Sequence, residues 1–143
     1  MIVAAAAYGP RSRFFFYGTL LDDDIRRGVI GRDVALSPAS LAGFRRVRAA
    51  GKWYPILVPG LARDQVMGAL AERLTRAEIA RLIAYEDAGY RLTQAKVTLA
   101  DGAAAKALVF LPFRALKATA EPWDLASWQE REKPRVMRLR LWA

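Results

Sequence analysis

Glu86 is the residue whose position is most unusual for its type. Thr75 to Glu78 has the S/T-x-x-E form of a capping box, and it predicts a helix that runs to about Glu86. Along this helix Ile79, Leu82 and Ile83 share one face, and Glu86 occupies the next position of that face. Burial there would raise the pKa of the carboxyl, which suits a general base near neutral pH. The alternative is a glutamate at the frayed end of the helix that points to water.

A glycine-containing turn is the second candidate for chemistry. Tyr17, Gly18, Thr19 and Leu20 directly follow a run of three phenylalanines with high strand propensity. Such a turn can offer backbone N–H groups to an anion or to a carbonyl oxygen, although a plain turn has the same sequence. The segment Gly51 to Pro55 brings two aromatic rings and a proline close to a glycine, as an ordinary loop also would.

The composition excludes several kinds of catalysis. The 143 residues include no Cys and no His, which excludes thiolate nucleophiles, Ser-His-Asp triads and metals held by imidazole or thiolate. Acid–base chemistry must therefore use a carboxylate, Lys, Tyr or the substrate's own amine. Asp22 to Asp24 are interpreted as acids at the start of a helix, not as a metal site.

The formal charge of +9 comes from 23 Lys and Arg against 14 Asp and Glu, and the excess lies towards both ends of the chain. Because it forms no single stripe and no nucleic-acid recognition motif is present, nucleic acid is an improbable partner.

The expected elements do not alternate regularly between strand and helix. Strands are expected over 14–17, 41–48, 54–58, 65–74, 90–99 and 105–111. Helices are expected over 22–30, with Gly31 just past the end, and over 75–86 and 122–131, and a basic strand or tail over 134–142. Pro55 indicates that its strand is an edge strand or a loop. Asp101-Gly102 predicts a hairpin turn, and Gly89 is expected to terminate the helix before it. This order favours an α+β domain with a mixed or barrel-like sheet over a doubly wound parallel sheet.

The chain is interpreted as one domain over 13–143, with a divergent C-terminal tail, after a flexible segment over 1–12. Its first apolar run is short and is followed by arginines, the wrong order for a signal peptide, and no stretch is apolar enough to span a membrane. A cytoplasmic location is expected. The sequence carries no signal for an oligomeric state.

Taken in order, four segments resemble the gamma-glutamylcyclotransferase-like superfamily, which includes gamma-glutamylamine cyclotransferases and plant avirulence-induced proteins. These segments span Tyr17 to Leu20, Trp53 to Pro55, Val66 to Gly68 and Tyr85 to Arg91. The resemblance covers roughly residues 13–113. The sequence departs from the family in carrying Asp87 after Glu86, where a glycine is common, and one extra residue between Gly51 and Tyr54.

The resemblance implies a small mixed β-barrel with a few helices packed around it, and a reaction that needs no cofactor or metal. In this reaction the α-amine of a gamma-glutamyl amine or peptide attacks its own γ-amide carbonyl, which gives 5-oxoproline and a free amine. Glu86 would be the general acid and base. The substrate-binding residues would be Tyr17, Gly18, Thr19, Leu20, Tyr54, Pro55 and Tyr90.

Two other functions stay open at this point. A non-catalytic protein that binds a small anionic or zwitterionic ligand would use the same fold. A basic nucleic-acid-binding domain ranks last.

Overall fold

A computed structural model describes residues 8–86, 89–113 and 116–139 of the chain. The strands are β1 (Phe14–Phe16), β2 (Ser37–Ala42), β3 (Phe44–Ala49), β4 (Pro55–Pro59), β5 (Gln65–Ala71), β6 (Tyr90–Leu99), β7 (Ala104–Pro112) and β8 (Ala118–Pro122). The helices are α1 (Asp23–Ile30), α2 (Arg76–Tyr85), α3 (Leu125–Arg131) and α4 (Lys133–Leu139), with a single 3-10 turn, η2 (Thr19–Leu21).

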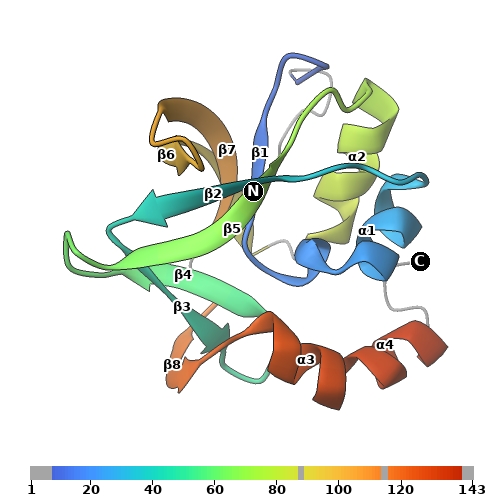
Figure 1. The fold of residues 1–143 in the computed structure, drawn as a ribbon. Helices are drawn as coiled ribbons and strands as arrows, with labels where there is room; N and C mark the ends of the chain where they lie inside the picture. Colours follow the sequence, from blue (N-terminus) through green and yellow to red (C-terminus); the bar gives the residue numbers. More distant parts are fainter. Residues whose placement is uncertain (1–7, 87–88, 114–115, 140–143) are drawn as a thin grey trace.

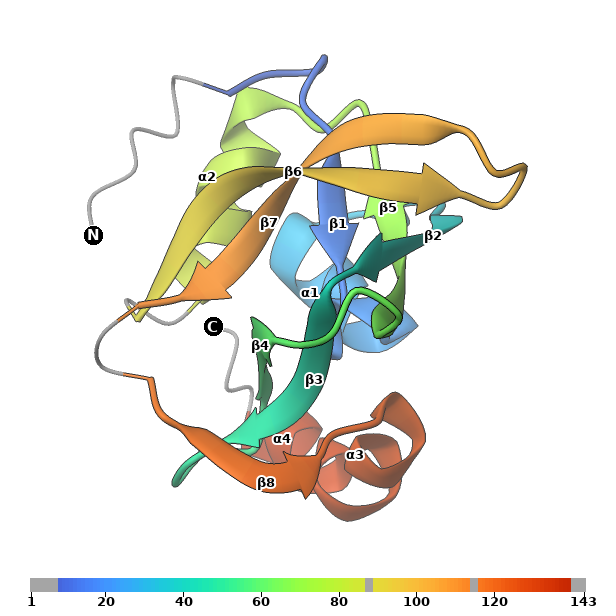
Figure 2. The ribbon, with the colours of Figure 1, turned by 90° about the vertical axis from the view of Figure 1, so that its left-hand side faces the viewer.

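Five strands close a barrel in the order β1-β5-β2-β6-β7 (Figures 1 and 2). β7 returns beside β1 and runs parallel to it, whereas the other neighbouring strands are antiparallel. A second sheet, in the order β4-β3-β8, lies below the barrel in the view of Figure 1. This arrangement confirms the predicted α+β class and the mixed barrel.

The core has two parts because β1 is buried on both faces. Phe15 belongs to the cluster that fills the barrel, to which all five barrel strands contribute. Phe14 and Phe16 point the other way, into a cluster that also holds Ile25 of α1, Leu82 of α2 and other helical residues. Figure 1 shows α1 and α2 side by side against the barrel, and α3 and α4 beside the second sheet. Alternation along one strand thus connects the barrel to its helices.

One predicted strand is two strands. The strand expected over 41–48 is broken at Gly43, where β2 ends and β3 begins in the other sheet. Gly43 has φ +85°, a conformation that favours glycine, and its N–H donates to the Asp64 carbonyl at 2.8 Å. The prediction that Pro55 marks an edge is confirmed, because β4 is an edge strand of the second sheet.

The predicted extent of α2 to about Glu86 is confirmed, because the helix ends at Tyr85 with Glu86 as its extended C-cap. Gly89 lies three residues beyond this cap and does not form it. The predicted start of α3 was wrong. α3 begins after Asp124, whose side chain accepts the Ser127 N–H at 2.8 Å, while Pro122 ends β8 instead of opening the helix.

The basic strand or tail expected over 134–142 was also wrong where the structure describes it, because residues 133–139 form α4. Val136 is the one residue of α4 that is fully buried, and Lys and Arg are good helix formers. The short alternation of basic and apolar residues therefore wrongly indicated a strand. Residues 140–142 of that prediction lie outside the described residues, as do 1–7 of the predicted N-terminal segment. Tyr8, the first described residue, packs edge-on against Phe14 at 6.5 Å between ring centroids. Among the described residues, no helix has the length and apolarity needed to cross a membrane.

Candidate functional site

One cavity collects all eight residues that the sequence singled out. Its empty space, counted to its open mouth, is about 340 Å³. It is lined by Tyr17, Gly18, Thr19, Leu20, Tyr54, Pro55, Glu86 and Tyr90, together with Phe15, Phe16 and Phe110. These residues come from the end of β1, from η2, from the start of β4, from the end of α2 and from the hairpin β6–β7. Segments distant in sequence therefore converge on one site.

The turn η2 offers backbone donors to this cavity. The hydrogen bonds that close it run from the Leu21 N–H to the Gly18 carbonyl and from the Asp22 N–H to the Thr19 carbonyl, both at 3.0 Å. The N–H groups of Thr19 and Leu20 lie before the first of these donors, so the turn itself does not use them. Such groups can donate to a negatively charged oxygen.

Two side chains hold the turn in place. Arg26 of α1 donates from Nη1 to the carbonyls of Leu20 and Leu21, at 3.0 and 3.2 Å. Thr19 Oγ1 lies 2.6 Å from the hydroxyl of Tyr85, the last residue of α2. The turn is thereby fastened to both helices that cover the barrel.

Glu86 is half-buried at the end of α2, directly after Tyr85. Its N–H donates to the Leu82 carbonyl at 3.3 Å, and the backbone then turns to an extended conformation. Glu86 therefore lies at the end of its helix, as the alternative interpretation expected. Its side chain nevertheless lines the cavity. Asp87 and Ala88, which complete the sequence motif, lie outside the described residues.

The negative charge of Glu86 acts on two tyrosines, the buried Tyr17 and the partly buried Tyr85. The pKa of Tyr17 is raised well above its usual value, first by burial and then by the negative charge of Glu86, against a smaller opposing effect of Arg46. The pKa of Tyr85 is raised for the same two main reasons, although its hydrogen bond with Thr19 acts the other way. Both phenols therefore stay protonated at neutral pH, and neither can act there as a base.

Aromatic rings form another part of the cavity wall. The ring of Tyr90 lies 6.1 Å from that of Tyr54 and 6.4 Å from that of Phe110, measured between centroids. The Tyr90 hydroxyl donates to the Pro55 carbonyl, and the Tyr17 hydroxyl donates to the Phe110 carbonyl. These bonds tie β4 to β6 and β1 to β7 at the cavity.

Gly18 fits closely beside this wall. A Cβ at its position would stand 3.1 Å from Cγ of Pro55, which is tighter than an ordinary contact. A side chain there would push the turn away from β4.

Arg46 is a supporting residue that the sequence analysis missed. Its guanidinium donates to the carbonyls of Tyr17 and Trp123, at 2.8 and 3.1 Å, and stacks on the Trp123 ring at 5.5 Å. Burial lowers the pKa of Arg46. Nothing in its sequence context separates it from neighbouring Arg45 and Arg48, because its partners come from distant segments.

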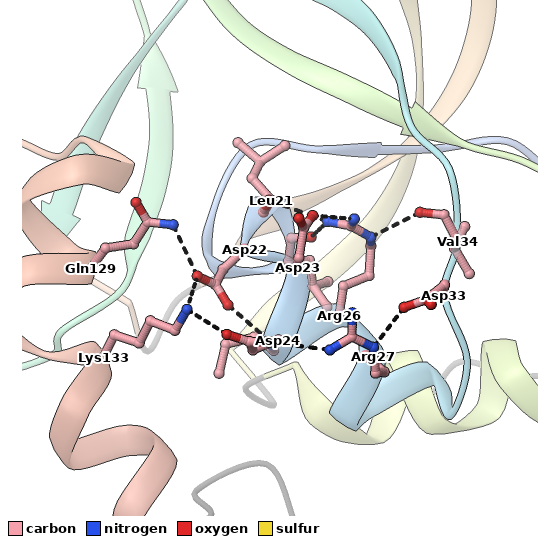
Figure 3. A network of polar contacts seen from close by, with 12 residues as sticks. Leu21, Asp22, Asp23, Asp24, Arg26, Arg27, Asp33, Val34, Gln129 and Lys133 are labelled. Atoms are coloured by element: carbon pink, nitrogen blue, oxygen red, sulfur yellow. Dashed lines mark hydrogen bonds and ion pairs between the residues drawn. The ribbon is translucent and has the colours of Figure 1, made fainter.

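A polar network fixes the element that follows the turn (Figure 3). Asp22 is buried and caps α1, accepting the Ile25 N–H at 2.9 Å. Its other oxygen accepts from Gln129 of α3 at 2.9 Å and from Lys133 of α4 at 2.8 Å, and Lys133 also contacts Asp24 at 2.8 Å. The prediction that these aspartates start a helix is confirmed, but the two C-terminal partners were missed.

The described residues contain no group of three or more carboxylates placed to hold a metal ion.

The chain is similar to known proteins over most of its length. The model of the family described as "Gamma-glutamyl cyclotransferase, AIG2-like" matches residues 14–130, so α4 lies beyond the match. The chain is 29% identical to AIG2-like protein D of Arabidopsis thaliana over 119 residues, which cover 81% of this chain and 78% of the relative. It is 26% identical to AIG2-like protein C of the same plant over 138 residues, or 93% of this chain and 76% of the relative.

Solved structures show the same fold. A solution structure from Arabidopsis thaliana superposes with a TM-score of 0.68 at 21% identity, covering 96% of this chain and 93% of that one. A structure named gamma-glutamyl cyclotransferase superposes with a TM-score of 0.63 at 17% identity, covering 92% of this chain and 86% of that one.

Proposed function

Because the chain belongs to the gamma-glutamyl cyclotransferase, AIG2-like family, we propose that it converts a gamma-glutamyl amine or peptide to 5-oxoproline and a free amine. The observation that carries the proposal is the single cavity that holds both the Glu86 carboxylate and the η2 turn. The reaction needs one base and one binding place for a negatively charged oxygen, and these two features would supply them.

Glu86 would move the proton. It would accept a proton from the α-amino group of the substrate, which then attacks the γ-carbonyl carbon, and return that proton to the departing amine as the C–N bond breaks. Tyr17 also lines the cavity, but its raised pKa keeps its hydroxyl protonated, so it would not accept a proton at neutral pH. The substrate supplies its own nucleophile, so a chain without Cys or His can perform the reaction.

The turn would bind charge on the substrate. The N–H groups of Thr19 and Leu20 would donate to the substrate α-carboxylate or to the oxyanion that forms when the amine attacks. Arg26 and Tyr85 keep this turn rigid, so the donors are oriented before substrate arrives.

The aromatic wall would hold the chain of the glutamyl group. Tyr54, Pro55 and Tyr90 line the same cavity as the turn, and a substrate bound among them would be kept in a bent conformation with its amine close to its own carbonyl. Ring closure within one molecule then gains the rate advantage of fixed orientation.

The test is 5-oxoproline formation, measured by mass spectrometry with a panel of gamma-glutamyl amines and peptides. We expect turnover by the unaltered protein and a loss of about 10²-fold or more in Glu86→Gln, the usual effect of removing a general base. Glu72→Gln, at an exposed glutamate that lines no part of the cavity, is the matched control and should keep full activity.

Unchanged turnover in Glu86→Gln would refute the role of Glu86. Absence of product from the unaltered protein across the panel, with a raised melting temperature in the presence of the same compounds, would instead indicate a ligand-binding protein on this fold.

A further inference from the structure

Arg46 of β3 binds the chain where β1 leads into the η2 turn. Its Nη1 atom donates to the carbonyls of Tyr17 and Met67, at 2.8 and 3.2 Å, and its Nε atom donates to the Trp123 carbonyl at 3.1 Å. One guanidinium thus connects the end of β1, the strand β5 and the segment between β8 and α3. Arg46 itself does not line the candidate active site.

The charge of Arg46 is met mainly by backbone. Its side chain is half-buried and forms no ion pair with any residue that the structure describes. Burial lowers the pKa of Arg46, and the charges of Asp124 and Tyr17 oppose that effect. The guanidinium also lies over the Trp123 ring, 5.5 Å from its centroid. Because hydrogen bonds from a charged donor are stronger than neutral ones, the carbonyls that accept from Arg46 are held firmly.

The bond to the Tyr17 carbonyl fixes the direction of the next N–H group. The carbonyl and the N–H of a trans peptide unit point in opposite directions, and the described residues contain no cis peptide bond. The Tyr17 carbonyl faces β5, because the Nη1 atom from which it accepts also donates to Met67 of that strand. The Gly18 N–H belongs to the same peptide unit and therefore points away from β5.

The candidate active site lies on the side away from β5. Its described lining includes Phe110 of β7, the other barrel neighbour of β1, and Pro55 of β4, whereas no described residue of β5 lines it. Gly18 lines this cavity, and no described residue accepts from its N–H. The Gly18 N–H is thus a third backbone donor beside those of Thr19 and Leu20.

Backbone donors are important in this cavity because no described Lys or Arg lines it. A gamma-glutamyl compound brings an α-carboxylate, which the Glu86 carboxylate in the same cavity repels. The hydroxyls of Tyr17 and Tyr90 already donate to backbone carbonyls. The start of the η2 turn is therefore the element best placed to bind the carboxylate of the substrate.

We propose that Arg46 is a positioning residue, which holds the Tyr17 carbonyl so that the Gly18 N–H is directed at the α-carboxylate of the substrate. This inference rests on the proposed function and names a residue outside the cavity on which substrate binding depends. Arg46 touches no reacting atom. Its loss should weaken substrate binding without slowing the chemical step, because the carboxylate is bound alike in the substrate and in the transition state.

The first test compares two ligands that share a lactam ring: 5-oxoproline, which carries the carboxylate, and 2-pyrrolidone, which lacks it. In ¹H–¹⁵N NMR spectra of the full chain, we expect 5-oxoproline to shift the Gly18 amide signal saturably, and 2-pyrrolidone to shift it at least threefold less. This measurement uses the unaltered protein, so it does not depend on the folding of a variant. A Gly18 signal that 5-oxoproline does not move, or that both ligands move equally, would overturn the proposal.

Arg46→Met removes the hydrogen bonds but keeps an unbranched side chain over Trp123. We expect it to raise the KM for gamma-glutamyl compounds and the Kd of 5-oxoproline about tenfold, the lower end of the effect of one charged hydrogen bond. The kcat should stay within about twofold, and so should the Kd of 2-pyrrolidone. Arg46→Lys keeps the charge, but one ammonium group cannot hold the Tyr17 and Trp123 carbonyls together, so KM should still rise at least threefold.

Arg48→Met is the matched control. Arg48 also belongs to β3, and it donates to the carbonyls of Ala49 and Lys52 without contacting the turn. This variant loses the same charge and a similar number of hydrogen bonds, yet it should keep the KM and the Kd of the unaltered protein. Equal increases of KM in Arg46→Met and Arg48→Met, or a fall in kcat with KM unchanged, would overturn the role of Arg46.

The outcomes separate this inference from the proposed function. Turnover that depends on Glu86, with an unchanged KM in Arg46→Met, would keep the proposed function and overturn the role of Arg46. Binding of 5-oxoproline that weakens in Arg46→Met, without turnover of any compound of the panel, would refute the proposed function and support the role of Arg46 in binding the carboxylate. Absence of both turnover and 5-oxoproline binding in the unaltered protein would refute both.

Discussion

Replacing Lys133 by methionine should destabilise the protein by about 2 kcal/mol. Nζ of Lys133 lies 2.8 Å from carboxylate oxygens of both Asp22 and Asp24. The Asp22 side chain is 1% exposed, so the variant leaves a buried carboxylate without its cation. A hydrogen bond to a charged group contributes about 1.5–3 kcal/mol, and because Lys133 is 24% exposed we take the lower half of that range. In a domain of this size this loss lowers the melting temperature by about 4–8 °C.

The effect should depend on pH in a defined direction. Burial raises the pKa of Asp22, but hydrogen bonds from Lys133, the Ile25 N–H and Gln129 outweigh burial and leave the pKa below 3.8. Its stabilisation is therefore present above pH 3.8 and is lost as pH falls through the folded-state pKa. The pKa of Lys133 is raised above 10.5 by Asp22 and Asp24, so its contribution is present below pH 10.5 and is lost as pH rises through the raised value.

The assay is thermal and urea unfolding followed by circular dichroism at pH 3, 7 and 9. Lys96→Met, at an exposed lysine of β6, is the control and should change the free energy of unfolding by less than about 0.5 kcal/mol. The gap between the unaltered protein and Lys133→Met should be full at pH 7 and 9 and should narrow at pH 3. The reasoning fails if Lys133→Met is no less stable than Lys96→Met at pH 7, or if the gap is the same at pH 3.

Three further predictions concern the barrel and α2. Gly68→Ala should lower the free energy of unfolding in urea by about 3 kcal/mol or more, because the new Cβ would overlap the backbone oxygen of Phe16 in β1. A variant as stable as the unaltered protein would contradict the observed pairing of β1 with β5. Tyr17→Phe should cost about 1–2 kcal/mol by leaving the Phe110 carbonyl unpaired, and should leave the 295 nm absorbance titration below pH 11 unchanged, because the pKa of Tyr17 is raised. Glu78→Gln should cost about 1 kcal/mol at pH 7 but less at pH 3, because the Arg32 hydrogen bond lowers the pKa of Glu78; equal losses at both pH values would refute this.

Features fixed by near neighbours could be predicted from sequence. The capping box at Thr75, the acidic start of α1 and the turn at Asp101-Gly102 each depend on residues within three or four positions, and each is present. The candidate site was found for a related reason, since a local motif marked each of its segments.

Features that depend on distant contacts could not be predicted. Gly43 divides an otherwise continuous strand pattern because β3 must pair with β4 and β8 in another sheet. Arg46 is tied to the carbonyls of Tyr17 and Trp123, which sequence spacing cannot connect. The helix α4 is stabilised by the packing of Val136 in the core. The alternating basic and apolar residues of this segment give no indication of that contact.

The parallel pairing of β1 with β7 has a consequence for synthesis. Phe14 pairs with Leu108, so the first barrel strand cannot complete its hydrogen bonds until the last one has been translated. At about 5–20 residues per second, the ribosome needs about 5–20 s to reach that point. During this time three consecutive phenylalanines, which are almost fully buried in the finished protein, lack one of the two strands that flank them. This segment is therefore where we expect a holding chaperone to bind the growing polypeptide.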